Sequence, residues 1–459
     1  MEPIGRPGRA AGKRMKVLII LSPVVARNLC PVGIAYLKSF LTAKRDVEVL
    51  VWNLSNEIPV PNDEAGGYWM QRDNMLQFYN QHQEKFGEWT DRIMACDPDI
   101  IGFSVWASAK WASLFLAGMV KERDKSKVIV FGGPDCSIDG EDYIRQPHVD
   151  AVVRGEGEMA LLDILDQVRA TGKVGPLPGV LVRDGERVID GGWRPEIANL
   201  DELPFPDYSG NPNLKDDIPL ALGRGCMWRC RFCNSHIHMR RPRRRSARNI
   251  YNEIRHQKER FPKICHFSYG DPNGIQDLGM LSELCDLLSV EDLHIHISLW
   301  SSLRPRPDLA LLKKMKRAGF GSISFGVQTA SPRIKKAQGL AYYSVEDAER
   351  LIRDCFSAGI EATLNFIVGF PGETWDDFQQ TMDFIKRNKG YIHSIPFIHT
   401  FVVLHKSWVE RFPRKHGLDT DDPAVALQWR HPEAAAMAGK AYELIKGWGI
   451  RIEPPAGRD

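Results

Sequence analysis

Three cysteines that lie close together are the residues of this chain best suited to chemistry. They are Cys226, Cys230 and Cys233, spaced C-x3-C-x2-C, and no fourth cysteine follows within thirty residues. Thiolates are the usual ligands of iron–sulfur clusters, and a cubane 4Fe–4S cluster normally takes four of them. Three thiolates leave one iron open to an outside ligand. The spacing therefore predicts a cluster with an open iron.

A zinc site and a group of unrelated thiols are the two alternatives. Zinc normally takes four protein ligands, and His236 and His238 lie near enough in the sequence to contribute. The other six of the nine cysteines are scattered, so they do not form a disulfide framework. This usage is typical of a protein of the reducing cytoplasm.

With Phe232 directly before the last cysteine, this segment resembles the signature of the radical S-adenosylmethionine (radical SAM) enzymes. The resemblance implies that Cys226, Cys230 and Cys233 hold the cluster and that S-adenosylmethionine chelates the open iron. It also implies cleavage of the sulfonium to a 5′-deoxyadenosyl radical, for which the protein supplies orientation and exclusion of water. An external one-electron reductant of the flavodoxin or ferredoxin type is then expected.

The length and charge of the chain limit its organisation and its partners. Its 459 residues suffice for two or three domains, and a net charge of +3 implies no general attraction to nucleic acid or membrane. Residues 1–15 are expected to be a disordered basic leader. The apolar run Val17–Leu21 is too short for a signal peptide or a membrane span, so it is interpreted as a buried strand.

Residues 16–172 are expected to form a Rossmann-like α/β domain with a doubly wound parallel sheet. Apolar strands alternate with helical stretches, which is typical of such sheets. A polar, aromatic-rich insertion is expected at roughly 57–95. The predicted strands are Lys16–Leu21, Val47–Trp52, Ile100–Val105, Lys127–Phe131 and Ala151–Val153.

Small and polar residues follow three of these strands, at the edge where such sheets bind ligands. Simple turn formation would also explain the glycines. Together with Pro31 and Gly33, this series resembles the cobalamin-binding domain fused ahead of many radical SAM enzymes, over about residues 16–165. The Asp-x-His-x-x-Gly motif of other cobalamin domains is absent, so no histidine is expected on the cobalt. By the resemblance, the cobalamin site comprises Ser104, Gly132, Gly133, Gly155, Glu156 and Gly157.

A linker with a small hairpin at Val180–Val188 is expected over residues 173–217. Residues 218–405 then repeat a strand–helix pattern six times, which suits the open (β/α)6 barrel of the radical SAM fold. Residues 406–459 are expected to form a helical cap. The predicted barrel strands are Pro219–Gly223, His266–Tyr269, His294–Ser298, Ser322–Val327, Ala362–Val368 and Pro396–Val403.

Polar residues at the carboxyl ends of the barrel strands are candidates for binding S-adenosylmethionine. They are Asp271, Arg304, Gln328 and Ser331, and Arg304 is expected to meet the carboxylate of S-adenosylmethionine. Helix capping or loop tethering is the alternative role for each of them. The segment Gly369–Thr374 resembles a turn that follows the fifth strand in these enzymes. Six arginines at 240–248 form either a solvated face or an anion clamp.

Three functions remain open at this point, and the sequence identifies no catalytic side chain. The resemblance favours a methyltransferase that uses methylcobalamin and a 5′-deoxyadenosyl radical to methylate a carbon or phosphinate centre of a small molecule or peptide. The second is another radical reaction, such as cyclisation, ring contraction or oxidation. The third is an iron–sulfur protein for electron transfer or sensing, which would normally hold its cluster with four protein ligands.

Overall fold

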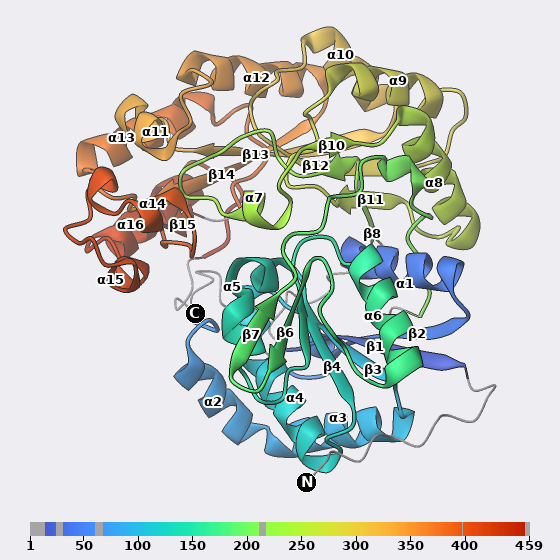
Figure 1. The fold of residues 1–459 in the computed structure, drawn as a ribbon. Helices are drawn as coiled ribbons and strands as arrows, with labels where there is room; N and C mark the ends of the chain where they lie inside the picture. The colour runs from blue at the N-terminus through green and yellow to red at the C-terminus, as the bar shows by residue number, and fades with distance from the viewer. Residues whose placement is uncertain (1–13, 24–30, 60–67, 211–216, 397, 455–459) are drawn as a thin grey trace. The chain divides into compact units, whose positions relative to one another are not determined.

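The computed structural model describes residues 14–23, 31–59, 68–210, 217–396 and 398–454 (Figure 1). They form two compact units, Met1–Lys215 with Ile237–Met239, and Asp216–His236 with Arg240–Asp459. The leader predicted at 1–15 lies, up to residue 13, outside the described residues. Within the described part of the chain, no helix is long and apolar enough to cross a membrane.

The first unit contains a seven-stranded sheet in the order β2-β1-β3-β4-β5-β6-β7. The first five strands are parallel, and the order reverses between β1 and β3, as in doubly wound folds. This confirms the predicted sheet. Their bounds are β1 (Met15–Leu21), β2 (Val47–Asn53), β3 (Ile100–Ser104), β4 (Val128–Gly132) and β5 (Ala151–Val153).

Helices cover both faces of this sheet, which explains the continuous apolar strands. On one face α1 (Val32–Lys44) contacts α6 (Glu158–Thr171). Residues of the other four helices share a core with the strands. These helices are α2 (Arg72–Gln81), α3 (Gln83–Cys96), α4 (Lys110–Arg123) and α5 (Pro134–Ile144).

Two sequence predictions for this unit need correction. The expected polar insertion contains α2 and α3, and Phe86, Trp89 and Ile93 are fully buried at helical spacing, so it belongs to the core. The hairpin expected in the linker forms β6 (Val180–Asp184) and β7 (Arg187–Asp190). Because β6 pairs antiparallel with β5, the hairpin extends the sheet.

The second unit contains six parallel strands in the order β15-β14-β13-β12-β11-β8. Strands β8 and β15 are the two edges, so the barrel is open, as predicted. The strands are β8 (Asp217–Leu220), β11 (His266–Tyr269), β12 (His296–Ser301), β13 (Phe320–Gln328), β14 (Glu361–Val368) and β15 (Ile398–Thr400).

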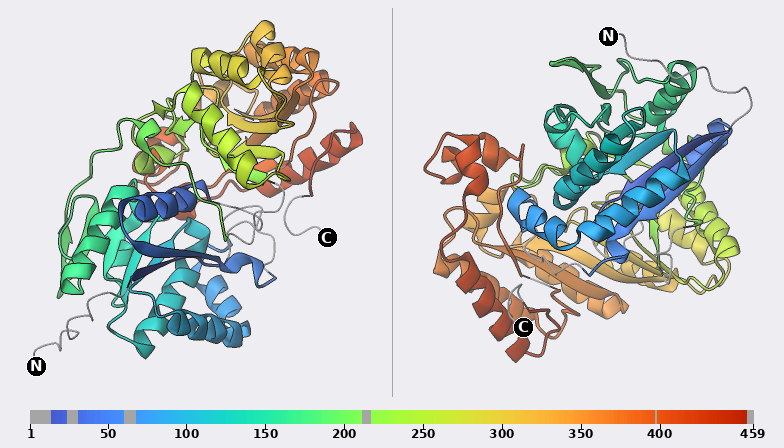
Figure 2. Two further views of the ribbon diagram at one scale, coloured as in Figure 1. Left: turned by 90° about the vertical axis from the view of Figure 1, so that its right-hand side faces the viewer. Right: turned by 90° about the horizontal axis from the view of Figure 1, so that it is seen from below.

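Five helices alternate with these strands and line the outer side of the curved sheet (Figures 1 and 2). Capping side chains at Ser246, Asp277, Asp308, Ser344 and Thr374 begin them by accepting backbone N–H groups of the first turn. The helices are α8 (Ala247–Arg260), α9 (Leu278–Leu288), α10 (Leu309–Arg317), α12 (Val345–Ala358) and α13 (Trp375–Asn388).

Short elements complete the second unit. A core that includes Phe370, Phe401, Val409 and Leu418 joins the C-terminal helices to the last strands. The additional strands are β9 (Gly223–Arg224) and β10 (Arg243–Arg244), and the additional helices are α11 (Pro332–Gln338), α14 (Trp408–Arg411), α15 (Pro423–Gln428) and α16 (Ala434–Gly447). Helix α7 (Ser235–His238) begins in this unit, and its last two residues belong to the first.

Candidate functional site

The three cysteines lie on a loop that is closed at its base by a two-residue antiparallel pair. Strand β9 precedes the loop, and β10 follows it, with Arg224 opposite Arg243 and Gly223 opposite Arg244. A Cβ on Gly223 would lie 2.4 Å from the Arg243 carbonyl oxygen, so only glycine allows this close approach. The loop therefore leaves the carboxyl end of the first barrel strand in a fixed geometry.

Gln276 ties the first residues of this loop to the segment after β11. Its Oε1 accepts the Met227 N–H at 2.8 Å, and its Nε2 donates to the Gly225 carbonyl at 3.0 Å. Gly225 has a left-handed φ of 80°, which favours glycine. These contacts fix the backbone on both sides of Cys226.

Each of the three cysteines is partly buried, and the thiols of Cys226 and Cys233 have a side-chain partner. Asn273 Nδ2 donates to Cys226 Sγ at 3.8 Å, and the Ser235 hydroxyl lies 3.1 Å from Cys233 Sγ. Trp228, which lies between Cys226 and Cys230 in the loop, stacks on the ring of Tyr342, with ring centroids 3.7 Å apart. Two of the three thiols thus have a polar side chain within hydrogen-bonding distance.

Burial and mutual repulsion oppose ionisation of these thiols. Burial raises the pKa of Cys226, and burial followed by the neighbouring Cys233 and Cys226 sulfurs raises the pKa of Cys230 to about 12. Thiolates that are partly buried and close to one another need a positive charge beside them. This donor set fits an iron–sulfur cluster.

No three His, Cys, Asp or Glu side chains among the described residues converge to hold a single metal ion. A cubane cluster does not require three side chains to converge on one ion, because each cysteine binds its own iron at a separate corner. Burial lowers the pKa of His236, one of the two histidines named for the zinc alternative, and so favours its neutral form.

The arginine-rich segment after the loop is only partly a solvated face. Arg245 is 4% exposed, and its guanidinium contacts Glu253 at 2.6 Å, the Asn249 side chain at 2.7 Å and the Ala221 carbonyl at 2.8 Å. This arginine anchors β10 to helix α8. The solvated-face interpretation is therefore wrong for Arg245.

Asp271 holds the base of the same loop from the end of β11. It is 5% exposed, and its two oxygens accept the backbone N–H groups of Leu222 at 2.6 Å and Gly223 at 3.0 Å. Burial raises the pKa of Asp271 to about 7, against the opposing effect of these hydrogen bonds. These contacts of Asp271 are those of a loop tether, which was the alternative role considered for it.

Arg304 and Gln328 lie at the ends of two neighbouring strands. Arg304 Nη2 contacts Asp347 Oδ2 at 2.7 Å, and Asp347 also belongs to the capping box of α12. Gln328 has a left-handed φ of 65° where the pairing of β13 with β14 shifts register. This backbone change redirects its side chain. Their expected contacts with S-adenosylmethionine stay predictions.

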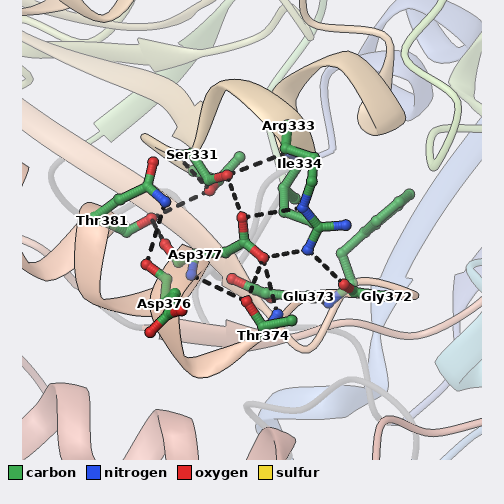
Figure 3. Close-up of polar contacts among 12 residues, drawn as sticks. Ser331, Arg333, Ile334, Gly372, Glu373, Thr374, Asp376, Asp377 and Thr381 are labelled. Carbon is green, nitrogen blue, oxygen red and sulfur yellow. Dashed lines mark hydrogen bonds and ion pairs between the residues drawn. The ribbon is translucent and has the colours of Figure 1, made fainter.

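Ser331 is fully buried in a polar network between the start of α11 and the start of α13 (Figure 3). Its hydroxyl donates to Asp377 Oδ1 at 2.6 Å and accepts the Ile334 N–H, so Ser331 caps α11. Burial alone would raise the pKa of Asp377. Hydrogen bonds from Arg333, Ser331 and Thr374 overcome this effect and hold its pKa well below the usual range. The contacts of Ser331 are those of a helix cap, which was the alternative role considered for it.

The turn Gly369–Thr374 starts helix α13, as its resemblance predicted. Glu373 is 4% exposed, and its Oε2 accepts the N–H groups of Gly369 and Phe370. Burial raises the pKa of Glu373 to about 7. Thr374 caps the helix through a capping box with Asp377.

In the first unit, the strand order brings most of the predicted cobalamin residues to one sheet edge. Ser104 ends β3 directly opposite Gly132 at the end of β4, and Gly155 follows β5, the next strand. Gly132 has room for a side chain, because an added Cβ comes no nearer than 3.7 Å to Val153. These half-buried strand ends lie at the edge where parallel sheets bind their ligands.

Other residues of the predicted cobalamin site make close contacts within the fold itself. An added Cβ on Gly133, whose φ is 102°, would lie 2.8 Å from the Val105 nitrogen. Glu156 Oε2 accepts the Ile197 N–H at 2.7 Å and so ties down the segment after the hairpin. An added Cβ on Gly157 would lie 3.1 Å from a Leu37 methyl group.

Comparison with known families identifies both units. Residues 72–165 match the B12 binding domain, and residues 220–385 match the radical SAM superfamily. The chain therefore contains both domains of a cobalamin-dependent radical SAM enzyme. These two domains imply a 4Fe–4S cluster, S-adenosylmethionine and cobalamin as cofactors. They also make the chain an enzyme, against the electron-transfer hypothesis.

Relatives of this radical SAM enzyme include methyltransferases and a cyclase. An uncharacterised methyltransferase of Pyrococcus horikoshii is 27% identical over 400 residues, covering 82% of this chain and 78% of the relative. Cytidylyl-2-hydroxyethylphosphonate methyltransferase of Streptomyces wedmorensis is 23% identical, with coverage of 83% and 78%. Anaerobic magnesium-protoporphyrin IX monomethyl ester cyclase of Rubrivivax gelatinosus is 25% identical, with coverage of 78% and 62%.

Solved structures of two radical SAM enzymes share the fold. OxsB with aqua-cobalamin bound has a TM-score of 0.66 at 16% identity, over 88% of this chain and 55% of OxsB. The methyltransferase TsrM from Kitasatospora setae, with cobalamin and a [4Fe-4S] cluster bound, has a TM-score of 0.64 at 17% identity, over 84% of this chain and 75% of TsrM.

The sequence did not single out the residues around the thiols of this radical SAM enzyme. Asn273 follows Asp271 closely and could have been found as a further polar residue at a strand end. Tyr342 lies more than a hundred residues after Cys230, in a loop with no motif. Only the fold brings its ring onto Trp228 of the cysteine loop.

Proposed function

We propose that this enzyme is a cobalamin-dependent radical methyltransferase in which Cys226, Cys230 and Cys233 hold the 4Fe–4S cluster. One observation carries the proposal: a loop presenting three partly buried thiols follows the first strand of a radical SAM barrel on a chain that also has a B12-binding domain. When bound, the cofactors supply a 5′-deoxyadenosyl radical and a transferable methyl group.

The contributions of the protein itself are orientation and shielding. Gln276 and Asp271 hold the loop in place, and the glycine edge of the first sheet supports the corrin by backbone contacts near Ser104 and Gly132. Arg304 and Gln328 remain our candidates for binding S-adenosylmethionine. Hydrogen-bonding groups that the fold already holds in place lower the entropic cost of binding the cofactors.

The proposed substrate is a small molecule or peptide with a carbon or phosphinate centre that accepts a methyl group. An external one-electron reductant of the flavodoxin or ferredoxin type supplies the electron. We place the enzyme in the cytoplasm, because the eight described cysteines are all free thiols.

Radical cyclisation is the second candidate, favoured by the similarity to the Rubrivivax gelatinosus cyclase. Anaerobic reconstitution with iron, sulfide and hydroxocobalamin, followed by S-adenosylmethionine and reductant, separates the two. A methyltransferase forms 5′-deoxyadenosine, S-adenosylhomocysteine and methylcobalamin. A cyclase forms 5′-deoxyadenosine without S-adenosylhomocysteine, and a protein that forms neither product contradicts the proposal.

A further inference from the structure

The short helix α14 and the residues before it lie directly against the cysteine loop. The Val409 N–H donates at 3.3 Å to the carbonyl of Arg231, which lies between the second and third cysteines. Phe232, the next residue of the loop, packs against the core that includes Val409. The Asn234 side chain, directly after the last cysteine, donates to the His405 carbonyl at 3.1 Å. Helix α14 is therefore held beside the segment that carries two of the candidate cluster ligands.

The outer side of α14 exposes two stacked aromatic rings. Trp408 is 43% exposed and Phe412 is 37% exposed, and their ring centroids are 5.2 Å apart. The Lys415 ammonium lies 4.9 Å from the centroid of the Phe412 ring. Val409 and Glu410, between the two rings in sequence, are buried and anchor the helix in the core. Exposed aromatic side chains next to a cation have the composition of a protein interface, where Trp and Phe are enriched.

The cysteine loop adds positive charge beside these rings. From Ile218 to Asn252 the chain has nine arginines and no Asp or Glu. Two of these arginines, Arg229 and Arg231, lie between the cysteines and are exposed. Their guanidinium groups donate to backbone carbonyls, and neither forms an ion pair with any carboxylate of the described residues. The charge of both arginines therefore remains available to a partner.

Helix α14 and the turn after it contribute two more exposed cations, Arg411 and Lys415. Neither is paired with a carboxylate in the part of the chain that the structure describes. Arg414 contacts Asp421 at 2.5 Å and Asp419 at 3.5 Å, so it adds no net positive charge. Together with Arg229 and Arg231, these two cations make the surface around the aromatic pair positively charged.

We propose that an acidic one-electron carrier protein docks on this surface and reduces the cluster from there. The carrier loses one electron and the cluster gains it, and no covalent bond forms or breaks. Complementary charge accelerates the encounter, and the aromatic rings supply the central contact. The inference rests on the proposed function, which already requires an external reductant. The surface consists of Arg229, Arg231, Trp408, Arg411, Phe412 and Lys415.

The test measures how fast reduced flavodoxin, the probe carrier, reduces the reconstituted protein under anaerobic conditions. Stopped-flow absorbance follows the electron transfer, and calorimetry follows the binding of oxidised flavodoxin. The first variant combines Arg411→Glu with Lys415→Glu. The matched control combines Lys313→Glu with Arg317→Glu, because these two residues are exposed cations of helix α10 and give the same change in net charge. Reduced methyl viologen, a small cation, is the reductant that needs no docking surface.

At low ionic strength, the first variant should lower the second-order rate constant with flavodoxin about tenfold, the lower end of the range for electrostatic steering. The difference should shrink to less than about twofold near 1 M salt, where the screening length is about 3 Å. Reduction by methyl viologen should not become slower, and the α10 control should keep the wild-type rate constant. A second variant, Trp408→Ala, should weaken flavodoxin binding at both salt concentrations with unchanged iron content.

Two results would overturn the inference: wild-type flavodoxin kinetics and binding in both the charge-reversal variant and Trp408→Ala, or an equal decrease in the α10 control. A wild-type cluster that accepts electrons from methyl viologen but not from flavodoxin contradicts this inference alone. A wild-type protein that assembles no cluster contradicts both the inference and the proposed function. Iron content therefore separates the two failures.

Discussion

Arg245 and Glu253 form an ion pair of 2.6 Å in which the side chains are 3% and 0% exposed. The pair joins the end of the arginine-rich segment to helix α8. Because β10 begins only two residues earlier and closes the cysteine loop, the pair connects the stability of the barrel wall to the geometry of the candidate cluster site.

Glu253→Gln should lower the free energy of unfolding by about 3–5 kcal/mol, because it leaves the charge of Arg245 buried without its counterion. Chemical denaturation of the apo protein measures the loss. The control is Glu259→Gln on the same helix, where the exposed pair with Arg255 has its atoms 3.9 Å apart. The control should change stability by about 0–1 kcal/mol. Equal effects of the two variants would show that the buried pair has no special role.

Replacing Cys226, Cys230 and Cys233 by alanine should remove the cluster. After anaerobic reconstitution, the triple variant should lose the iron–sulfur absorbance, its iron content should fall from about four per chain to near zero, and it should no longer cleave S-adenosylmethionine. The control is Cys265→Ala, because Cys265 is an exposed thiol of the same unit outside the loop. A triple variant with wild-type iron content would refute the assignment.

Gly132→Leu should lower cobalamin occupancy without unfolding the protein. The fold leaves room for a Cβ at this position, so the leucine side chain competes with the ligand at the strand ends and not with the core. Cobalamin is measured by absorbance after reconstitution, and folding by thermal denaturation without cobalamin.

Gly133→Ala is the contrasting variant for the cobalamin site. Its Cβ would collide with the Val105 backbone, so the melting temperature should fall even without cobalamin. Normal cobalamin occupancy in Gly132→Leu would place the ligand elsewhere. Loss of both the cobalamin and the cluster in that variant would indicate misfolding.

Asp377→Asn should destabilise the protein by about 2–3 kcal/mol near pH 7, because it weakens hydrogen bonds to a buried charged group. The folded pKa of Asp377 is lowered, so its contribution is fully present above the unfolded pKa of about 3.9 and is lost as the pH falls further. The difference between variant and wild type should therefore shrink below about pH 4.

The matched control for this effect is Asp376→Asn, at the neighbouring exposed position in the first turn of α13. It should cost about 0.3–1 kcal/mol through the helix dipole alone. Denaturant unfolding of both variants from pH 7 down to pH 3 makes the comparison. A pH-independent difference for Asp377→Asn would contradict the lowered pKa.

Local sequence patterns predicted the elements of this fold well. Helices α8, α9 and α12 follow from such patterns, because a capping side chain marks the start of each and apolar residues recur at helical spacing along it. The six barrel strands and their order also follow from the strand–helix alternation. The pairing of the hairpin with β5 did not follow, because sheet edges are decided by contacts between distant segments.

The roles of single site residues were harder to predict. The cysteine spacing located the loop, but Asp271 and Ser331 make tethering and capping contacts that local sequence does not distinguish from ligand binding. Arg245 looked like part of a charged surface, and only the position of Glu253 on α8 makes it a buried residue. Such assignments depend on partners supplied by the tertiary fold.

The two-residue pairing of β9 with β10 has a consequence for how this protein can evolve. Residues 223–244 begin and end at adjacent points in space. The loop between them therefore does not set the register of the flanking strands. The loop is nevertheless tied to Gln276 outside it. A chimaera that exchanges residues 223–244 between homologues should therefore keep the cluster loop in place only when this partner is exchanged with them.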